Sequence, residues 1–417
     1  MSLAHGQRGR RQPTSEHADW PRPWVQLRSA AYHPFIYRNM VRAASSDARP
    51  GNVVAVFDKR GDRFGSGFYN PRSRITLRML SFTDIPIDDG FFETRLEQAV
   101  SLRRNILQLD QATNAYRVVH AEGDSLSGWV VDRFDDVLSV EAFALGPYLR
   151  IGDLLPRLHA LCGTRRQIVR MDSRAAELEG AKPTTAKGDE IRSVRIVEHG
   201  VRFAVDFAQG QKTGFFCDQR ENRQLFANWA RGRSVLDLCC YTGGFSIYAL
   251  KNGGASDVTG VDLDEKAIDQ ARHNANLNQV RARWVHADAF KYMRQMGENG
   301  RTWESVVLDP PKLIVSRDRY EEGERKYFDL NRLALQLVAP GGLFVTCSCS
   351  GLMPRETFEK LVVSAARSVG RPLQILRSTG ASPDHPGLSN CPESLYLNVL
   401  WTRVLERDVP TLPRKAR

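Results

Sequence analysis

The spacing of apolar residues predicts a different kind of structure at the front of the chain than at its end. Near the front, short apolar runs separated by Gly, Pro and Asp turns predict β-strands at Trp24–Arg28, Asn52–Asp58, Gly65–Asn70 and Ile75–Leu80. Phe91–Asp110 then carries apolar residues among charges without proline or glycine, which predicts a connecting helix. The pattern therefore indicates a small β-rich domain that ends near this helix.

The remainder of the chain divides into a mixed part and a regularly alternating part. Predicted strands at Tyr116–His120, Gly128–Asp132 and Val137–Phe143 precede a predicted helix at Leu149–Leu161, which indicates an α+β module. From Ser234 onward, helix-length segments separate four buried-strand runs: Val235–Leu238, Val258–Val261, Ser305–Leu308 and Leu343–Cys347. This alternation is typical of a doubly wound, parallel α/β sheet, whose ligands bind at the carboxyl ends of the strands.

Charge separates the front of the chain from the rest. The 417 residues carry a formal net charge of +11, and residues 1–80 alone hold fourteen Lys/Arg against five Asp/Glu. A basic segment of this kind is either a solvated face or a surface for a polyanion. We favour nucleic acid as the partner of the basic front.

Several protein classes are disfavoured by composition. No stretch approaches the ~18 uninterrupted apolar residues of a membrane span, and the polar start lacks the apolar core of a secretory signal. The seven cysteines are odd in number and form no C-x-x-C pair, which predicts reduced thiols and no structural zinc. We therefore expect a cytoplasmic protein without a membrane partner or a metal site.

Acidic residues end the predicted strands of the last part. Asp237 precedes a glycine turn, and Asp262 follows that turn by about 20 residues, where an acid can accept both hydroxyls of a ribose. Asp288 ends a further strand, in WVHADAF, and suits a base-edge amino group. Asp309 ends the run Ser305–Leu308, where the next two prolines force an extended backbone. Any of these acids could instead cap a helix, which is the simplest interpretation of the nearby Asp264.

The glycine turn itself narrows the choice of ligand. It matches neither the phosphate-binding G-x-x-x-x-G-K-[ST] pattern nor a strict G-x-G-x-x-G. A nucleoside without phosphate therefore suits it better than a dinucleotide, and we expect this ligand at Tyr241, Thr242 and Gly243.

Two cysteines near the end of the last predicted strand are candidate nucleophiles. Cys347 and Cys349 are two residues apart, so they point to the same face and alternation cannot choose between them. Burial as a small apolar residue is the usual fate of a free cysteine, and we expect it for Cys347 and for the pair Cys239–Cys240. Cys349 lies between two serines where the strand ends, so we expect partial exposure and a nucleophilic thiolate.

These motifs together resemble a known family. The segment D-L-x-x-Y-T-G-G, the strand-ending acids and D-P-P-K resemble class I methyltransferases that use S-adenosylmethionine. More specifically, seven segments resemble the bacterial 23S ribosomal RNA large-subunit methyltransferase I family, which makes 5-methylcytosine. They are HPFIYRNMV, HAEGDSLSGWVVDRFDD, GQKTGFFCDQRENR, LDLCCYTGGFS, LDPPK, SCSGLM and DHP…CPESLYL.

The resemblance implies an architecture and a site. It implies a basic tail at 1–23, a PUA-like RNA-binding β-barrel at 24–98, a linker helix and α+β domain at 99–200, and a Rossmann-like catalytic domain at 201–417. S-adenosylmethionine would be held by the acids and turn residues named above: Asp237, Tyr241, Thr242, Gly243, Asp262, Asp288 and Asp309. The implied catalytic residues are Cys349 and Asp309. The implied partner is RNA, 23S ribosomal RNA in particular, and the oligomeric state stays open, a homodimer included.

The sequence leaves three points open. Related RNA enzymes carry a second cysteine where this chain has Pro311, so water or Asp309 has to assist product release. A methyltransferase acting on a purine or a ring nitrogen would need no thiol. A catalytically idle RNA-binding assembly protein would keep the basic front and the fold, although the four strand-ending acids argue against it.

Overall fold

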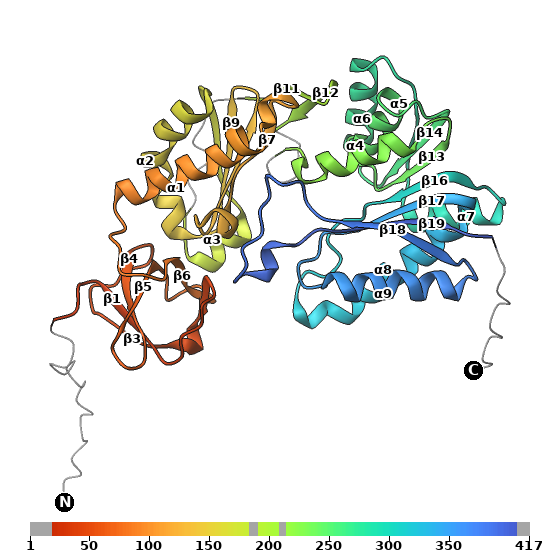
Figure 1. Ribbon diagram of the computed structural model, residues 1–417. Helices are drawn as coiled ribbons and strands as arrows, with labels where there is room; N and C mark the ends of the chain where they lie inside the picture. Colours follow the sequence, from red (N-terminus) through yellow and green to blue (C-terminus); the bar gives the residue numbers. More distant parts are fainter. Residues whose placement is uncertain (1–18, 183–190, 208–213, 407–417) are drawn as a thin grey trace, which may run out of the picture. The chain divides into compact units, whose positions relative to one another are not determined.

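The chain folds into two compact units, residues 1–87 and residues 88–417. The structure is a computed structural model and describes residues 19–182, 191–207 and 214–406 (Figure 1). Most of the expected basic tail, residues 1–18, lies outside the described residues. No helix among those described has the length and apolar character needed to cross a membrane.

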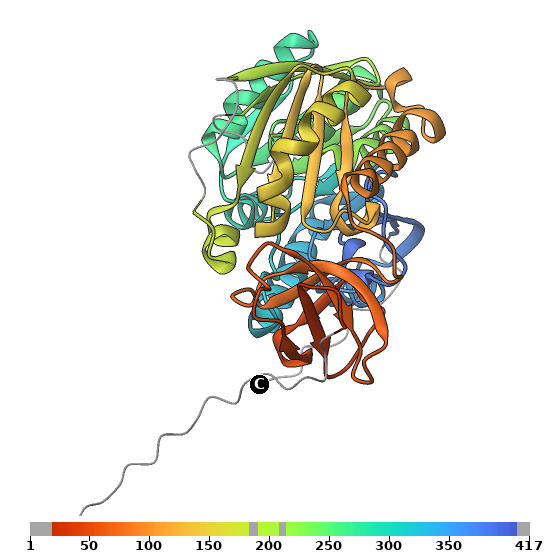
Figure 2. The same ribbon diagram turned by 90° about the vertical axis from the view of Figure 1, so that its left-hand side faces the viewer.

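The first unit is a six-stranded sheet that curls around its own apolar core (Figure 2). The strand order is β2-β6-β5-β4-β1-β3. The strands are β1 Trp24–Leu27, β2 Phe35–Tyr37, β3 Val41–Ala44, β4 Val53–Phe57, β5 Arg63–Tyr69 and β6 Ile75–Ser81. The four strands predicted here are confirmed, whereas β2 and β3 were missed because they are short and only one of their side chains, Ile36, is buried. Gly65 allows β5 and β6 to approach closely, since a Cβ there would lie 2.1 Å from the Ser81 carbonyl oxygen.

The second unit begins with two helices packed against a four-stranded sheet of order β10-β9-β8-β7. The elements are α1 Asp89–Ser101, β7 Ala115–His120, β8 Trp129–Phe134, β9 Val137–Ala142, α2 Leu145–Cys162, β10 Arg166–Met171 and α3 Ser173–Glu179. The helix predicted for Phe91–Asp110 is wrong at its end, because a π-helical turn at Leu102–Ile106 follows α1. Within this turn Arg103 is fully buried and donates to the Arg117 carbonyl oxygen at 2.9 Å.

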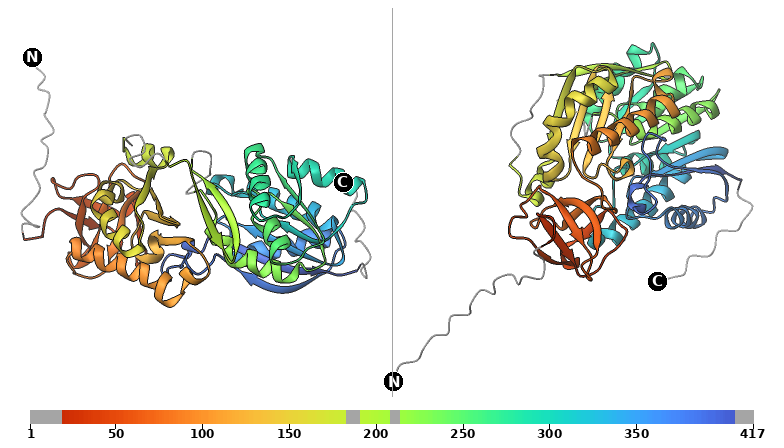
Figure 3. Two further views of the ribbon diagram at one scale, coloured as in Figure 1. Left: turned by 90° about the horizontal axis from the view of Figure 1, so that it is seen from above. Right: turned by 60° about the vertical axis from the view of Figure 1, so that its left-hand side comes forward.

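A two-stranded ribbon lies between this sheet and the last one (Figure 3). It consists of β11 Ser193–Glu198 and β12 Val201–Asp206, paired antiparallel. Ile196 and Phe203 of the ribbon are fully buried in a cluster that also contains Phe134 of the four-stranded sheet and Tyr248 of α5, residues Gly244–Lys251. The ribbon therefore joins the two larger sheets through apolar contacts.

The last sheet has seven strands in the order β15-β14-β13-β16-β17-β19-β18. The strands are β13 Ser234–Leu238, β14 Asp257–Asp262, β15 Arg283–His286, β16 Trp303–Leu308, β17 Val338–Ser348, β18 Leu373–Thr379 and β19 Asn398–Val404. The four predicted strands are confirmed and lie parallel. The prediction of a fully parallel sheet was wrong at one edge, where β19 pairs antiparallel with both β17 and β18. Most side chains of β18 are exposed, so this strand shows no alternating pattern in the sequence.

Helices cover both faces of the seven-stranded sheet (Figure 1). They are α4 Arg220–Trp229, α5, α6 Glu265–Leu277, α7 Ala289–Glu298, α8 Tyr320–Gln336 and α9 Arg355–Ser368. One apolar cluster contains side chains of α7, α8 and α9, and another contains side chains of α4 and α5. This arrangement is doubly wound and leaves the carboxyl ends of the parallel strands accessible to a ligand.

Candidate active site

The strand order reverses between β13 and β16, and the candidate site lies at this point. From β13 the sheet continues through β14 and β15, while from β16 it continues through β17. Asp237 lies near the carboxyl end of β13, and Asp309 directly follows β16 with its amide donating to the Leu238 carbonyl oxygen at 3.2 Å. Ligands of open α/β sheets bind at such a reversal. The two acids predicted from sequence are thus brought to one place.

The turn after β13 has an unusual backbone. Cys239, Tyr241 and Gly243 all have positive φ, at 61°, 48° and 82°. Positive φ is uncommon for residues other than glycine and gathers at functional sites. Gly243 immediately precedes α5, and a Cβ there would lie 2.6 Å from the Trp284 ring, so only glycine fits. Packing against Trp284 therefore requires glycine here, whether or not a ligand also approaches the turn.

Asp237 presents an unmet acceptor inside the protein. Its Oδ2 accepts hydrogen bonds from the backbone amide and the hydroxyl of Ser246 at 3.0 and 2.7 Å. Its Oδ1 is buried and has no hydrogen-bond partner within the described part of the chain. Burial raises the pKa of this carboxyl to about 6. An unsatisfied buried oxygen is costly, so a ligand that donates a hydrogen bond here would be favoured.

The other two strand-ending acids have structural partners. Asp262 accepts from the Tyr241 amide at 2.8 Å and from the Asp264 amide at 2.9 Å, so it holds the turn after β13. Asp264 caps α6, which confirms its simplest interpretation. Asp288 caps α7 by accepting from the Lys291 amide at 2.9 Å. Their partial exposure leaves room for a ligand role, which stays a prediction.

A pocket beside Asp237 contains residues that sequence reasoning missed. It is lined by Tyr241 and Thr242 of the turn, by Asp309, and by four residues of the segment Phe215–Arg223: Phe215, Phe216, Gln219 and Arg223. That segment is part of the family resemblance, but its sequence alone predicts no role for it. Because it precedes the parallel strands, only the folded chain reveals that it borders the pocket.

Asp309 has a strongly altered environment. Burial raises the pKa of its carboxyl to about 7, and the neighbouring carboxylates Asp218 and Asp237 add to the shift. Gln219 opposes the shift by donating to Oδ2 at 3.0 Å. A carboxyl of this kind exists in both protonation states near neutral pH, so it can donate as well as accept a proton.

Burial distinguishes the two candidate cysteines. Cys347 is fully buried in the core, and burial raises the pKa of its thiol well above the usual value. Cys349 lies just beyond the end of β17, is partly exposed, and donates to the Pro310 carbonyl oxygen at 3.9 Å. The thiol of Cys349 therefore contacts the D-P-P segment that begins with Asp309. Of the pair Cys239–Cys240, only Cys240 is buried as expected, since Cys239 is partly exposed and lines the pocket.

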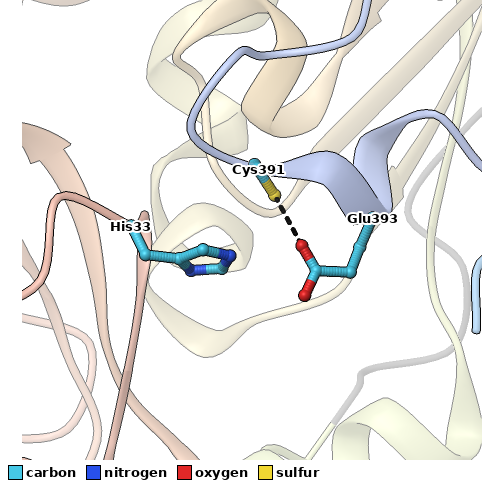
Figure 4. A group of neighbouring side chains, drawn as sticks. All are labelled: His33, Cys391 and Glu393. Atoms are coloured by element: carbon cyan, nitrogen blue, oxygen red, sulfur yellow. Dashed lines mark hydrogen bonds between the residues drawn. The ribbon is translucent and has the colours of Figure 1, made fainter.

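A further thiol lies near a carboxylate elsewhere in the second unit. Cys391 donates to a Glu393 oxygen at 3.8 Å (Figure 4). His33, the third side chain drawn there, belongs to the first unit. We assign no metal site to this group.

Comparisons with known proteins decide the family. A family model described as S-adenosylmethionine-dependent methyltransferase matches residues 168–386, and a PUA-like domain model matches residues 28–82. The chain is 36% identical over 380 residues to a ribosomal RNA large subunit methyltransferase I from Alteromonas mediterranea, covering 90% of this chain and 95% of the relative. A relative of the same name from Tolumonas auensis is 38% identical over 381 residues, with 89% and 96% covered. The chain belongs to the ribosomal RNA large subunit methyltransferase I family.

Solved structures support the fold of this methyltransferase. A candidate SAM-dependent methyltransferase from Streptococcus mutans superposes with a TM-score of 0.77 at 18% identity, covering 92% of this chain and 100% of the other. A candidate methyltransferase complexed with SAH superposes equally well, with a TM-score of 0.77 at 19% identity, covering 92% and 99%. The expected α/β architecture with a PUA-like front is thereby confirmed.

The family uses S-adenosylmethionine, and we expect the pocket beside Asp237 to be part of its site. The buried, unsatisfied Oδ1 of Asp237 suits the ammonium group of the cofactor, and the half-buried carboxylate of Asp262 suits its ribose hydroxyls. We expect the turn residues Tyr241, Thr242 and Gly243 to lie against the cofactor between these two acids. We expect Asp288, which follows the next strand β15, to contact the adenine.

Replacing Asp262 with alanine is expected to weaken S-adenosylmethionine binding by about 10- to 100-fold, because hydrogen bonds to a charged acceptor contribute roughly 1.5–3 kcal/mol. Isothermal titration calorimetry measures the affinity. Asp269→Ala is the control, since Asp269 is an exposed acid of α6 paired with Arg272. Undiminished affinity in Asp262→Ala would remove Asp262 from the cofactor site. A thermal melt of each variant shows whether the loss arises from the turn that Asp262 also supports.

Proposed function

We propose that this methyltransferase forms 5-methylcytosine in large-subunit ribosomal RNA through a covalent adduct of Cys349 at carbon 6. The names of its relatives, ribosomal RNA large subunit methyltransferases I, support ribosomal RNA as the substrate. The observation that carries the chemistry is the contact of the partly exposed Cys349 thiol with Pro310, directly after Asp309. This contact brings the Cys349 thiol next to the segment that begins with Asp309, and Asp309 lines the pocket.

Carbon 5 of cytosine is a weak nucleophile and needs activation before it can accept a methyl group. The Cys349 thiolate adds to carbon 6, and the electron pair of the 5,6 double bond moves toward carbon 5 and the N3 side of the ring. Asp309 in its protonated form donates to N3 and stabilises this developing charge. The raised pKa of Asp309, at about 7, makes that form available near neutral pH. A purine or ring-nitrogen reaction would leave Cys349 without a role.

The remaining steps restore the aromatic ring. S-adenosylmethionine supplies the methyl group as a sulfonium. Carbon 5 then loses its proton, the 5,6 double bond forms again and Cys349 leaves as a thiolate, so the enzyme is unchanged. Pro311 occupies the position of a second cysteine, so we assign the assisting base to water or Asp309. The cytosine has to leave its stack for carbon 5 to reach both the thiol and the cofactor.

We further propose the three expected domains, a PUA-like RNA-binding domain at 24–98, an α+β domain at 99–200 and the catalytic domain at 201–417, with the first limit moved to residue 87 because α1 belongs to the second unit. The four-stranded sheet with α1 and α2 has its own apolar layer, contributed by Leu96, Trp129 and Leu155 among others. This layer supports a separate middle domain within the second unit.

The first unit is expected to supply part of the RNA affinity through phosphate contacts. Replacing its exposed residues Lys59, Arg60, Arg72 and Arg74 with glutamine should weaken RNA binding and flatten its dependence on salt, by a slope of roughly 0.7–0.9 for each phosphate that is no longer neutralised. Binding to large-subunit ribosomal RNA at several salt concentrations measures the slope.

A matched control for this variant exists in the second unit. Arg325, Lys326, Arg332 and Lys360 are each paired with an acid on their own helix, so their change to glutamine should leave the slope unchanged. If the two quadruple variants bind RNA with the same dependence on salt, the basic residues of the first unit form only a solvated face.

A further inference from the structure

A chain of hydrogen bonds runs from the antiparallel edge of the sheet to Asp309. The Trp401 indole of β19 donates to the Thr379 hydroxyl of β18 at 2.8 Å, and this hydroxyl donates to Asn222 Oδ1 of α4 at 2.7 Å. Asn222 Nδ2 donates to Gln219 Oε1 at 2.7 Å, and Gln219 Nε2 donates to Asp309 Oδ2 at 3.0 Å. These hydrogen bonds thus link β18 and β19 to a residue of the site.

The direction of this chain is determined at both ends and in the middle. An indole nitrogen can only donate, so the Thr379 hydroxyl accepts from Trp401 and uses its own hydrogen toward Asn222. Asn222 Nδ2 also donates to the Gly380 carbonyl oxygen at 3.0 Å. A flipped Asn222 amide would therefore set two acceptor oxygens against each other. A flipped Gln219 amide would set its Nε2 donor against the Asn222 Nδ2 donor, so neither amide has an alternative orientation.

Burial makes these hydrogen bonds expensive to break. Trp401, Asn222 and Gln219 are each less than 5% exposed. Water cannot easily replace a missing partner at such positions, and a donor left unpaired costs about 1–3 kcal/mol. Each amide is consequently held in one orientation, which is the requirement for a group that orients another.

We propose that Gln219 is a positioning residue for Asp309, kept in its donating orientation by Asn222, Thr379 and Trp401. Its donation occupies Oδ2, so the carboxyl group is held in one rotamer and its exchangeable proton resides on Oδ1. The oxygen that faces the substrate base is then the one that can donate to N3. This inference rests on the proposed function, because Asp309 is the group that Gln219 serves.

The surroundings of Asp309 determine how its titration responds. The titratable groups facing it are Asp218 beside Gln219, Asp237 of β13, Cys239 of the following turn and Cys347 of β17. Both Asp218 and Asp237 disfavour the ionised form, whereas hydrogen bonds from Gln219 and Cys347 favour it. Loss of the Gln219 donation should raise the pKa of Asp309 further.

The decisive experiment uses the full-length protein, saturating S-adenosylmethionine and large-subunit ribosomal RNA from cells that lack the protein. In single-turnover assays Gln219→Met, which keeps the side-chain volume but not the donor, is expected to slow methyl transfer about 10- to 100-fold. The descending alkaline limb of its pH–rate profile should move to higher pH. In an Asp309→Asn background the same change should cost little more, because the group it positions is already gone.

Two variants of Thr379 provide a matched comparison, because this residue lies outside the pocket and is proposed to act only through Asn222. Thr379→Val is expected to slow methyl transfer several-fold with unchanged cofactor affinity, and Thr379→Ser should restore the rate by restoring the hydroxyl. Equal rates for the valine and serine variants, or a full additional loss from Gln219→Met in the Asp309→Asn background, would overturn the positioning role. Full activity of Asp309→Asn alone would instead refute the acid in the proposed function.

Discussion

Replacing Cys349 with alanine is expected to abolish methyl transfer while S-adenosylmethionine still binds. The thiol is needed to activate carbon 5, whereas the groups proposed to hold the cofactor belong to β13, β14, β15 and the turns after them. Methyl incorporation into large-subunit ribosomal RNA measures the reaction, and calorimetry measures the binding. A variant that keeps activity would rule out the covalent mechanism.

The neighbouring cysteine is the control. Cys347→Ala should keep most activity, because Cys347 is fully buried in the core and has no proposed role in the reaction. Its cost should appear as a modest loss of stability from a small cavity. If Cys347→Ala were inactive and Cys349→Ala active, the roles of the two cysteines would have to be exchanged.

A trapped adduct gives a direct readout of the same step. RNA with 5-fluorocytosine at the target has fluorine in place of the proton that must leave carbon 5, so elimination of the cysteine fails. Wild type and Cys347→Ala should then accumulate a covalent protein–RNA complex that survives denaturing electrophoresis. Cys349→Ala should form none. Methyl transfer unaffected by either substitution would favour a purine or ring-nitrogen target.

The second large effect is expected on stability. Asp384 and Arg220 form an ion pair at 2.8 Å with both side chains fully buried, and Asp384 also accepts from the Arg117 amide at 2.9 Å. Asp384→Ala leaves the buried Arg220 charge with only the half-exposed Glu221 as an acidic partner, at 3.1 Å. We expect a loss of about 3–5 kcal/mol in the free energy of unfolding, because a single buried charge is far more costly than the pair.

Chemical denaturation at pH 7 tests this expectation. Glu356→Ala is the matched control, since Glu356 pairs with Lys360 on the surface of α9 with both side chains largely exposed. Such exposed pairs contribute only about 0–1 kcal/mol. Equal midpoints for Asp384→Ala and Glu356→Ala would mean that the buried pair contributes no more than a surface pair. The contacts of Asp384 with Arg220 of α4 and with the Arg117 amide of β7 would then not stabilise the fold.

The predicted strands were found because their signals are local. A short run of apolar residues bounded by turn residues is typical of a buried strand. The strands β13, β14, β16 and β17 all begin and end within about five residues of the prediction. The strands that were missed lack this signal. β2 and β3 are very short, β18 is mostly exposed, and the segment after α1 departs from the helix where Arg103 turns inward.

The sequence could predict only those site residues whose position follows from the strand order of the sheet. Acids that end parallel strands must meet at one edge of the sheet, so Asp237 and Asp309 were expected together. Gln219 gives no such signal, because its place beside Asp309 depends on how α4 packs. Nor could the spacing of Cys347 and Cys349 determine which thiol is accessible.

By itself, then, the amino-acid order determined the family, the alternation of strands and helices, and the acids at the strand ends, because each depends on neighbours along the chain. Tertiary structure alone decided three matters: which cysteine is partly exposed, which side chains raise the pKa of Asp309, and that an antiparallel edge reaches Asp309 through Asn222 and Gln219. Burial and hydrogen-bond direction are properties of groups that meet only after folding, so no local pattern encodes them.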